Sequence, residues 1–207
     1  MQLSQTDSFN QPVFRCPCHA CAFFNSADEE YEFLLPFAKA GYDAGDKLFQ
    51  VVSKNNFAVR RERLQQAGIK VGAAEHDGRL EIRAWEDAYL RNNRFDQNAM
   101  LELIQEVLRN GRASGYGMTR LWANMEWALE EMPGVHDIVE YETRLNKFLP
   151  TYNDIVVCTY DLNKFSAPVV MDIMRTHPHV LVGGVLQENP FYVSPDDFLQ
   201  ELDRRKE

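Results

Sequence analysis

Three cysteines and one histidine lie close together near the start of the chain, in the segment Cys16-Pro17-Cys18-His19-Ala20-Cys21. Thiolates and imidazoles are good ligands for zinc, and thiolates also hold iron–sulfur clusters. The spacing argues against a closed site, because such sites usually combine ligand pairs from two separate segments. A strand here would also point His19 and Cys21 to one side and Ala20 to the other. A zinc or iron–sulfur site formed by Cys16, Cys18, His19 and Cys21 is therefore the alternative prediction, beside buried thiols without a metal.

Glu142 is the most informative single residue, because its carboxylate falls on the apolar stripe of a helix predicted over residues 135–149. An ionised carboxylate in apolar surroundings needs a cationic or hydrogen-bonding partner, and we expect Arg120 or His177 to supply it. A structural ion pair between helix and sheet would satisfy this requirement, and so would a contact to a ligand. The sequence leaves both interpretations open.

The segment Gly41-Tyr42-Asp43-Ala44-Gly45-Asp46-Lys47-Leu48 is the nearest approach to a nucleotide-binding phosphate loop. Its glycines are one residue too close, no Ser or Thr follows the lysine to hold magnesium, and its two aspartates would face the phosphates. We therefore predict that a helix stops at Gly41 and a turn follows, without nucleotide hydrolysis.

No residue is assigned a catalytic role. The chain contains no Gly-Xaa-Ser-Xaa-Gly sequence, which marks many serine hydrolases. Cys158 lies inside a predicted strand, where we expect an inert thiol. The sequence thus favours a binding protein over an enzyme.

Strands and helices alternate along the chain. Strands are predicted over residues 19–24, 47–53, 69–73, 80–85, 118–123, 155–160 and 180–186, and helices over 26–41, 55–67, 97–112, 125–131, 135–149, 167–175 and after Ser194-Pro195. Residues 155–160 are apolar almost throughout, which is typical of a central parallel strand covered on both faces. The pattern predicts an α/β three-layer sandwich with a mostly parallel central sheet.

The composition limits the partners. The formal charge is −9, with 31 acidic and 22 basic residues, and such a field repels nucleic acid and anionic membrane surfaces. The start of the chain lacks the features of a signal peptide, and no apolar run is long enough for a membrane helix, so we expect a cytoplasmic protein. Residues 1–15 form a polar leader of a composition compatible with disorder, and residues 16–207 form one domain.

Parallel sheets bind ligands at the carboxyl ends of their strands, and several side chains are expected to line such a crevice. Asp161 follows the central strand, and Tyr160 and Trp127 could form an apolar wall, although core packing explains a tryptophan equally well. The complete set of predicted ligand-binding residues is His19, Arg120, Glu126, Trp127, Glu142, Tyr160, Asp161 and His177.

An ordered series of residues from His19 to Tyr192 resembles the MEDS domain, a family named for methanogen and methylotroph sensory proteins that includes the dichloromethane regulator. The matching landmarks are His19, Leu35-Pro36-Phe37, Gly41, Gly45-Asp46, Gly78, Leu80, Tyr89-Leu90, Phe95-Asp96, Arg120, Glu126, Trp127, Tyr141-Glu142, Leu145-Asn146, Cys158, Tyr160-Asp161 and His177-Pro178. The resemblance implies a RecA-like fold without a phosphate loop, and a sensory role.

The resemblance also implies a mode of action. A small organic ligand would bind the domain and alter its contact with a separate signalling partner, such as a histidine kinase or a transcription regulator, because no helix-turn-helix or kinase segment accompanies the domain in this sequence. A homodimer is compatible with this interpretation. Two alternatives remain: a metal-binding redox sensor or enzyme that uses the cysteine cluster, and a structural interaction domain.

Overall fold

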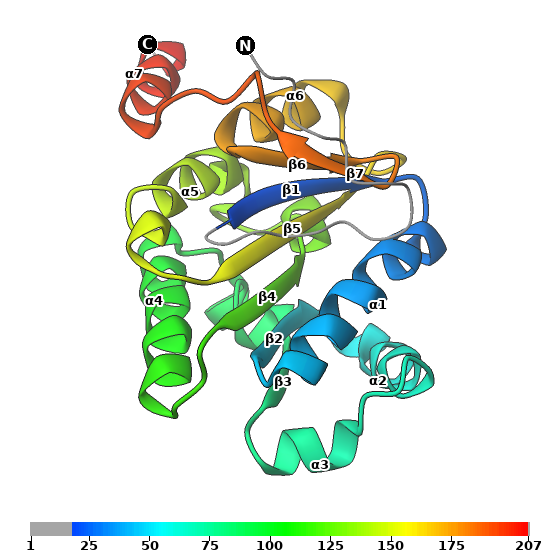
Figure 1. Cartoon of the computed structure of the whole chain (residues 1–207). Helices are drawn as coiled ribbons and strands as arrows, with labels where there is room; N and C mark the ends of the chain where they lie inside the picture. Colours follow the sequence, from blue (N-terminus) through cyan, green and yellow to red (C-terminus); the bar gives the residue numbers. More distant parts are fainter. Residues whose placement is uncertain (1–17, 207) are drawn as a thin grey trace, which may run out of the picture.

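The computed structural model describes residues 18–206, which form a seven-stranded sheet between two layers of helices (Figure 1). The strand order is β3 (Leu80–Ala84), β2 (Lys47–Val52), β4 (Thr119–Asn124), β5 (Ile155–Asp161), β1 (Cys18–Phe24), β6 (His179–Val182) and β7 (Val185–Glu188). Neighbouring strands are parallel except for β6 and β7. This arrangement confirms the predicted α/β class and the mostly parallel sheet. The predicted leader, residues 1–15, lies outside the described residues.

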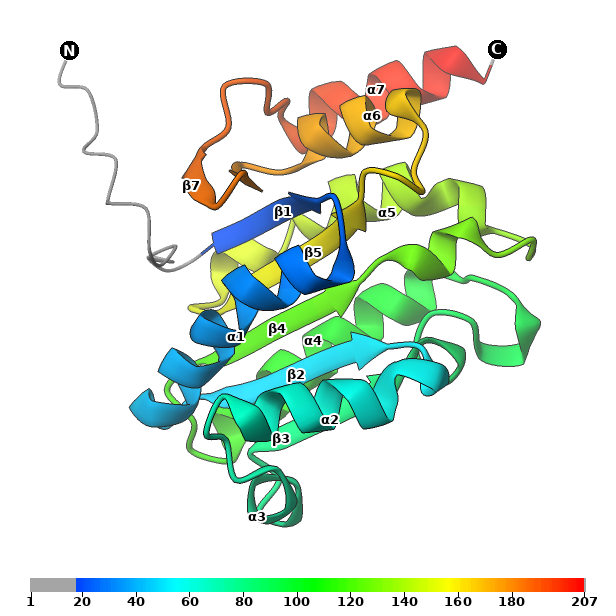
Figure 2. The same cartoon turned by 90° about the vertical axis from the view of Figure 1, so that its right-hand side faces the viewer.

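Helices cover both faces of the sheet. One face packs against α1 (Ala27–Ala44), α2 (Phe57–Gln66) and α3 (Val71–His76), and the other against α4 (Gln97–Ala113), α5 (Ile138–Leu145) and α6 (Ala167–Thr176). Figure 2 shows α1 and α2 in front of the sheet and α4 behind it. The last helix, α7 (Pro195–Arg205), packs beside α5 and α6. The described part of the chain also contains short 3₁₀ helices: η1 (Lys54–Asn56), η2 (Trp85–Asp87), η3 (Arg91–Asn93), η4 (Glu126–Leu129), η5 (Val135–Asp137) and η6 (Leu149–Thr151).

The first helix begins where its sequence predicts but ends later. The Ser26 hydroxyl accepts a hydrogen bond from the Glu29 amide at 3.1 Å, which satisfies an otherwise free donor at the helix start. The helix continues through Gly41 to Ala44, so the predicted stop at Gly41 is wrong. Gly45, with φ of +88°, ends the helix in the left-handed conformation. Gly41 serves packing instead, because the Arg120 side chain crosses the helix where a Cβ atom would lie.

Two predicted strands are also wrong. The apolar residues of segment 69–73 pack beneath α1 and α2, but Val71 begins helix α3, and so short an apolar run does not distinguish a strand from a helix. Segment 180–186 is divided by Gly183 and Gly184, which have φ of +55° and +75° and form the tight turn of the β6–β7 hairpin.

Strand β5 occupies the centre of the sheet, as its apolar sequence predicts. Alternate side chains enter different cores: Ile155 and Val157 pack toward α1, whereas Val156, Cys158 and Tyr160 pack toward α5. This alternation places one thiol and one phenol beneath the helix that carries Glu142. No helix within residues 18–206 has the length and apolarity to cross a bilayer.

Candidate functional site

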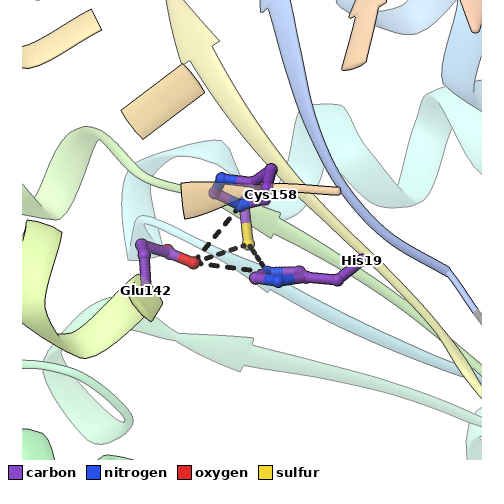
Figure 3. A group of neighbouring side chains, drawn as sticks. His19, Glu142 and Cys158 are labelled. Atoms are coloured by element: carbon purple, nitrogen blue, oxygen red, sulfur yellow. Dashed lines mark hydrogen bonds and ion pairs between the residues drawn. The ribbon is translucent and has the colours of Figure 1, made fainter. Parts of the chain in front are cut away.

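Four potential ligand side chains converge between the sheet and the α5–α6 layer. His19 comes from β1, Cys158 from β5, Glu142 from α5, and His177 from the segment between α6 and β6. One ligand atom from each residue lies within 4.8 Å of the other three. Figure 3 shows the side chains of His19, Glu142 and Cys158 pointing toward one another. We call these four residues the buried centre.

The Glu142 carboxylate lies in the middle of the buried centre. Its Oε2 atom lies 3.3 Å from Nε2 of His19 and 3.4 Å from Nε2 of His177. The Cys158 thiol lies 3.8 Å from both Glu142 Oε2 and His19 Nε2. On its far side, Glu142 Oε1 accepts a hydrogen bond of 3.1 Å from the Tyr160 hydroxyl. Oε2 therefore faces the centre, while Tyr160 fixes the rotation of the carboxylate.

Burial and the neighbouring side chains together determine the charges of Glu142, His19 and Cys158. Glu142 and His177 have no exposed surface, and Cys158 and His19 are 1% and 4% exposed. Burial alone would raise the pKa of Glu142, but the nearby His177 and His19 outweigh it and lower the pKa from its usual 4.5 to about 2. Burial, reinforced by the neighbouring His177, lowers the pKa of His19. At neutral pH the centre thus contains a carboxylate and a neutral His19.

The second nitrogen of each imidazole is fixed by a hydrogen bond. Asn146 Nδ2 donates to the carbonyls of Glu142 and Thr176, at 3.2 and 2.6 Å. Its Oδ1 must therefore accept, and Nδ1 of His19, 2.9 Å away, is the donor. Nδ1 of His177 donates to the Ile173 carbonyl at 2.9 Å. With Nδ1 held in this way, the Nε2 atoms of both rings face the Glu142 carboxylate, where each can share a proton with Glu142 or bind a cation.

Nitrogen, oxygen and sulfur atoms that can each bind a proton or a cation therefore meet in one place. Nε2 of His177 has no hydrogen-bond partner within residues 18–206. Burial, and the nearby Glu142 carboxylate, raise the pKa of Cys158, so its thiol is protonated when no cation is present. Such a set of atoms can hold a cation, or it can share a proton that a ligand or a pH change supplies.

A small pocket adjoins the buried centre. Its volume is about 220 Å³, and it is lined by Cys18, His19, Asn146, Leu149, Pro150, Asp154, Pro178 and His179. These residues start or precede β1, β5 and β6, so the pocket lies at the amino ends of the strands. The predicted crevice at the carboxyl ends, beside Asp161, is not where this pocket forms. His19 and Asn146 contribute to both the pocket and the surroundings of Glu142.

The structure brings together four of the eight predicted ligand-binding residues, namely His19, Glu142, Tyr160 and His177. It confirms that Glu142 is buried and that His177 lies beside it. Arg120 is not the partner of Glu142. Its guanidinium pairs with Asp46 at 2.8 Å and donates to the Phe37 carbonyl at 3.1 Å. The cause is its place near the start of β4, where it points toward α1 rather than α5.

The remaining predicted residues lie elsewhere. Glu126 and Asp161 both pair with Lys164, at 2.7 and 3.6 Å, in an ion-pair cluster at the carboxyl ends of the strands. Trp127 is fully buried and stacks on Tyr89 with ring centroids 4.5 Å apart, which is core packing. None of the eight predicted residues contributes to a second cavity, of about 300 Å³, which is formed by the segment that follows β3 in the chain. It is lined by Ala88, Tyr89, Arg91, Asn92, Arg94, Asp96 and Ala99.

The structure does not assemble the predicted cysteine cluster. Cys16 lies outside the described residues. Cys18 packs in the core beneath α1, whereas Cys21 packs in the core on the other side of the sheet. Side chains alternate between the two faces along a strand, so two residues that are three positions apart face opposite sides. Of Cys18, His19 and Cys21, which the structure describes, His19 enters the buried centre, and its sulfur neighbour there is Cys158.

Sequence reasoning missed Cys158 and Asn146. Cys158 was expected to be inert inside its strand, and only the pairing of β1 with β5 shows that His19 lies near it. Asn146 lies one helical turn after Glu142, which is the spacing that places both on one face. Both residues belong to the series that resembles the MEDS domain, and that series was the available signal.

A second buried carboxylate, missed by sequence reasoning, gives a useful contrast. Glu30 Oε1 accepts hydrogen bonds from Trp122 at 2.7 Å, Thr159 at 3.1 Å and Arg60 at 3.3 Å. The Arg60 guanidinium also covers the Trp122 ring, 3.6 Å from its centroid. Protein groups alone therefore compensate Glu30, as expected of a structural ion pair.

The connection between β1 and α1 lacks a phosphate loop. In phosphate-loop proteins the glycine-rich motif joins a strand to the following helix. Here Asn25 and Ser26 alone connect the two elements, and Ser26 is occupied as the helix cap. The Gly41–Leu48 segment lies elsewhere, at the end of α1 and the start of β2.

Comparison with known proteins gives the family and the fold. Residues 18–178 match MEDS, described as the methanogen/methylotroph, DcmR sensory domain. The chain is 28% identical over 160 residues to the transcriptional repressor DcmR of Methylorubrum extorquens, covering 77% of this chain and 57% of the repressor. It is also 28% identical over 123 residues to the alanine–tRNA ligase of Coxiella burnetii, which is 59% of this chain and 13% of the ligase.

A solved structure shares the fold. The crystal structure of a KaiC-like protein from Pyrococcus horikoshii matches 85% of this chain and 79% of its own, with a TM-score of 0.57 and 14% identity. The fold is therefore RecA-like. The chain spans somewhat more than half of the DcmR repressor and a small part of the ligase, so the match covers one portion of each relative.

Proposed function

The chain belongs to the MEDS family of sensory domains, and on that premise we propose that it detects a small organic molecule in the pocket at the amino ends of β1, β5 and β6. The observation that carries the proposal is a shared wall. His19 and Asn146 line the pocket, and both also contact Glu142: His19 lies beside its carboxylate, and Asn146 donates to its backbone carbonyl and holds His19. A molecule in the pocket would therefore contact residues that hold the buried centre.

The size and lining of the pocket suit a compact ligand. Its volume of about 220 Å³ lies below the range of roughly 300–1,000 Å³ that is usual for sites of drug-sized molecules. Leu149, Pro150 and Pro178 supply an apolar surface, and His179 supplies a hydrogen-bonding group. Nδ1 of His179 is buried without a hydrogen-bond partner in the described part of the chain. A molecule of a few heavy atoms with one polar group matches this lining.

Binding would reach the helical layer through Asn146. This side chain connects β1, through His19, with α5 and with the end of α6. Helix α5 in turn packs against α6 and α7. A ligand that favours one arrangement of His19 and Asn146 would shift the equilibrium between two packings of these helices and change the surface that a partner contacts.

The output proposed here is regulatory. The similarity to a transcriptional repressor supports a role in the control of transcription or signalling, through a transcription regulator or a histidine kinase, and a homodimer is compatible with it. In this proposal His19 touches the ligand, and Glu142, Tyr160 and His177 position His19. Arg120, Glu126, Trp127 and Asp161 take no part, because their contacts lie elsewhere.

A thermal-shift screen tests the pocket. Short-chain alcohols, amines, carboxylic acids and halogenated alkanes are added to the full chain, and at least one class should raise the melting temperature. Leu149→Trp fills the pocket and should abolish that rise, whereas Leu129→Trp, at a side chain that is 43% exposed, should leave it unchanged. A panel without any stabilising compound, or equal stabilisation of Leu149→Trp, would contradict the proposal and favour an interaction domain.

A further inference from the structure

We propose that His19, Glu142, Cys158 and His177 bind one divalent transition-metal ion, with zinc the best match. This proposal goes beyond ligand sensing and does not depend on it. It also differs from a site in the cysteine cluster at the start of the chain, because it takes only His19 from that segment and joins residues far apart in sequence.

The spacing of the four ligand atoms agrees with tetrahedral coordination. Zinc bonds of about 2.0–2.3 Å at tetrahedral angles place neighbouring ligand atoms about 3.3–3.7 Å apart. Glu142 Oε2 lies 3.3 Å from His19 Nε2 and 3.4 Å from His177 Nε2. Cys158 Sγ lies 3.8 Å from both Oε2 and His19 Nε2. Four of the six separations thus nearly match those around one shared ion, and the two that join His177 Nε2 to His19 Nε2 and to Cys158 Sγ lie within 4.8 Å.

The imidazoles present the correct atoms. The hydrogen bonds of Nδ1 in His19 and His177 orient both rings so that their Nε2 atoms are directed at the Glu142 carboxylate. A carboxylate oxygen and two imidazole nitrogens this close need something positive among them, which is either a proton on a nitrogen or a metal ion. Nε2 of His177 is completely buried and has no hydrogen-bond partner among the residues described. A cation satisfies all three atoms at once.

The charges also balance. A carboxylate from Glu142 and a thiolate from Cys158 carry two negative charges, which neutralise a divalent ion in a site without exposed surface. Metal binding deprotonates a coordinating thiol even where burial alone keeps it protonated. The Glu30 network on the other face needs no ion, since Arg60 already provides its positive charge.

The outer groups are those of a completed metal site. Metal-bound histidines usually donate their other N–H to a carbonyl or carboxylate oxygen, which fixes the ring. Here His19 donates to the Asn146 amide oxygen, His177 donates to the Ile173 carbonyl, and Tyr160 holds the second oxygen of Glu142. Every ligand except the thiol therefore has a supporting partner.

The donor set selects the class of metal. Calcium and magnesium require six or more oxygen ligands, so two nitrogens, one sulfur and one oxygen do not suit them. Mixed nitrogen and sulfur ligands in a tetrahedral arrangement favour zinc and its substitute cobalt(II). Four protein ligands would close the coordination sphere, which is typical of a structural ion that joins β1, β5, α5 and the α6–β6 connection.

Metal content and cobalt spectroscopy test the proposal on the full chain, expressed without a metal-affinity tag. The wild-type protein should contain close to one equivalent of zinc by elemental analysis. After the metal is removed, cobalt(II) should give the intense visible bands of a tetrahedral complex and a thiolate-to-cobalt charge-transfer band. Zinc titrations in competition with a chromophoric chelator give the affinity.

Two matched cysteine variants locate the site. Cys158→Ala should lose the charge-transfer band and weaken zinc binding at least about 100-fold. Loss of a residue that only supports a metal ligand weakens binding by about 10–100-fold, and loss of a ligand itself should cost at least the upper end of that range. Cys21→Ala should retain both, although Cys21 is fully buried, lies on the same sheet face and stands directly opposite Cys158 in the paired strand. His177→Gln should weaken binding similarly and keep the thiolate band of any residual complex.

The possible results separate clearly. Absence of stoichiometric zinc or cobalt binding by the wild type, or a cobalt spectrum without a thiolate band, would refute the site even if Cys158→Ala does not fold. Wild-type affinity in Cys158→Ala, or loss of the metal in Cys21→Ala, would place the ion elsewhere and overturn the proposal. Because Leu149→Trp removes the pocket and leaves all four ligands intact, a failed ligand screen and a failed metal assay can be told apart.

Discussion

Asn146→Ala is the substitution whose effect can be worked out most fully from the structure. The Asn146 side chain is buried and makes three hydrogen bonds: it accepts one from His19, and it donates to the carbonyls of Glu142 and Thr176. Alanine removes all three bonds and provides no group to replace them. The His19 N–H then loses its acceptor inside the protein.

The expected loss of stability follows from these contacts. At about 1 kcal/mol for each intramolecular hydrogen bond, three bonds correspond to about 3 kcal/mol. For a domain of this size, each kcal/mol corresponds to about 2–4 °C, so the melting temperature should fall by about 6–12 °C. Loss of the group that orients His19 should also weaken zinc binding by about 10–100-fold.

Urea denaturation of the chelator-treated protein measures the first effect, and competitive zinc titration measures the second. Asn98→Ala is the matched control, because Asn98 accepts one hydrogen bond from Arg144 at an exposed position, and its loss should change stability by no more than about 0.5 kcal/mol. A loss below about 1 kcal/mol in Asn146→Ala, equal to that of the control, would show that Asn146 does not support His19 as the structure implies.

Three further predictions concern other parts of the chain. Arg60→Ala leaves the Glu30 carboxylate buried without its cation and should destabilise the protein by about 3–5 kcal/mol in urea, whereas a nearly unchanged midpoint would mean that water reaches this network. Gly45→Ala forces a side chain into the left-handed conformation and should lower the free energy of unfolding by about 1 kcal/mol. Gly72→Ala, inside α3 with open space around it, should instead raise it by about 0.5–1 kcal/mol. Effects of the same sign for both variants in thermal unfolding would be inconsistent with this account. Hydrogen bonds from two arginines lower the pKa of Glu201 to about 2, below its usual 4.5, so its contribution to the docking of α7 is complete above pH 4.5 and is lost as the pH falls toward 2. The protection of the α7 amides, measured relative to their intrinsic exchange rates at each pH, should therefore fall over this interval in the wild type but show no such step in Glu201→Gln. Protection that is independent of pH in the wild type would argue against the link.

The architecture could be predicted from local patterns because each pattern has a local physical cause. The apolar run of β5 predicts a strand covered on both faces, and Ser26 predicts the start of α1. Where these causes are ambiguous, the predictions failed. Val71 looks strand-like in a short apolar run. Gly41 looks like a helix stop, but α1 continues to Ala44, and Gly41 packs against Arg120, a residue that is distant in sequence.

Helical periodicity was enough to predict that Glu142 is buried, because it places the residue among apolar neighbours. The sequence offered Arg120 and His177 as its candidate partners, and the fold places His177 beside it. The sequence also carried the resemblance to the MEDS domain, since the order of residues along a chain is enough to show a family. The thiol that joins His19 could be identified from the folded chain but not from the sequence. Pleating sends Cys18 to the opposite face, and the parallel pairing of β1 with β5 brings in Cys158, because strand pairing depends on contacts that sequence spacing does not record.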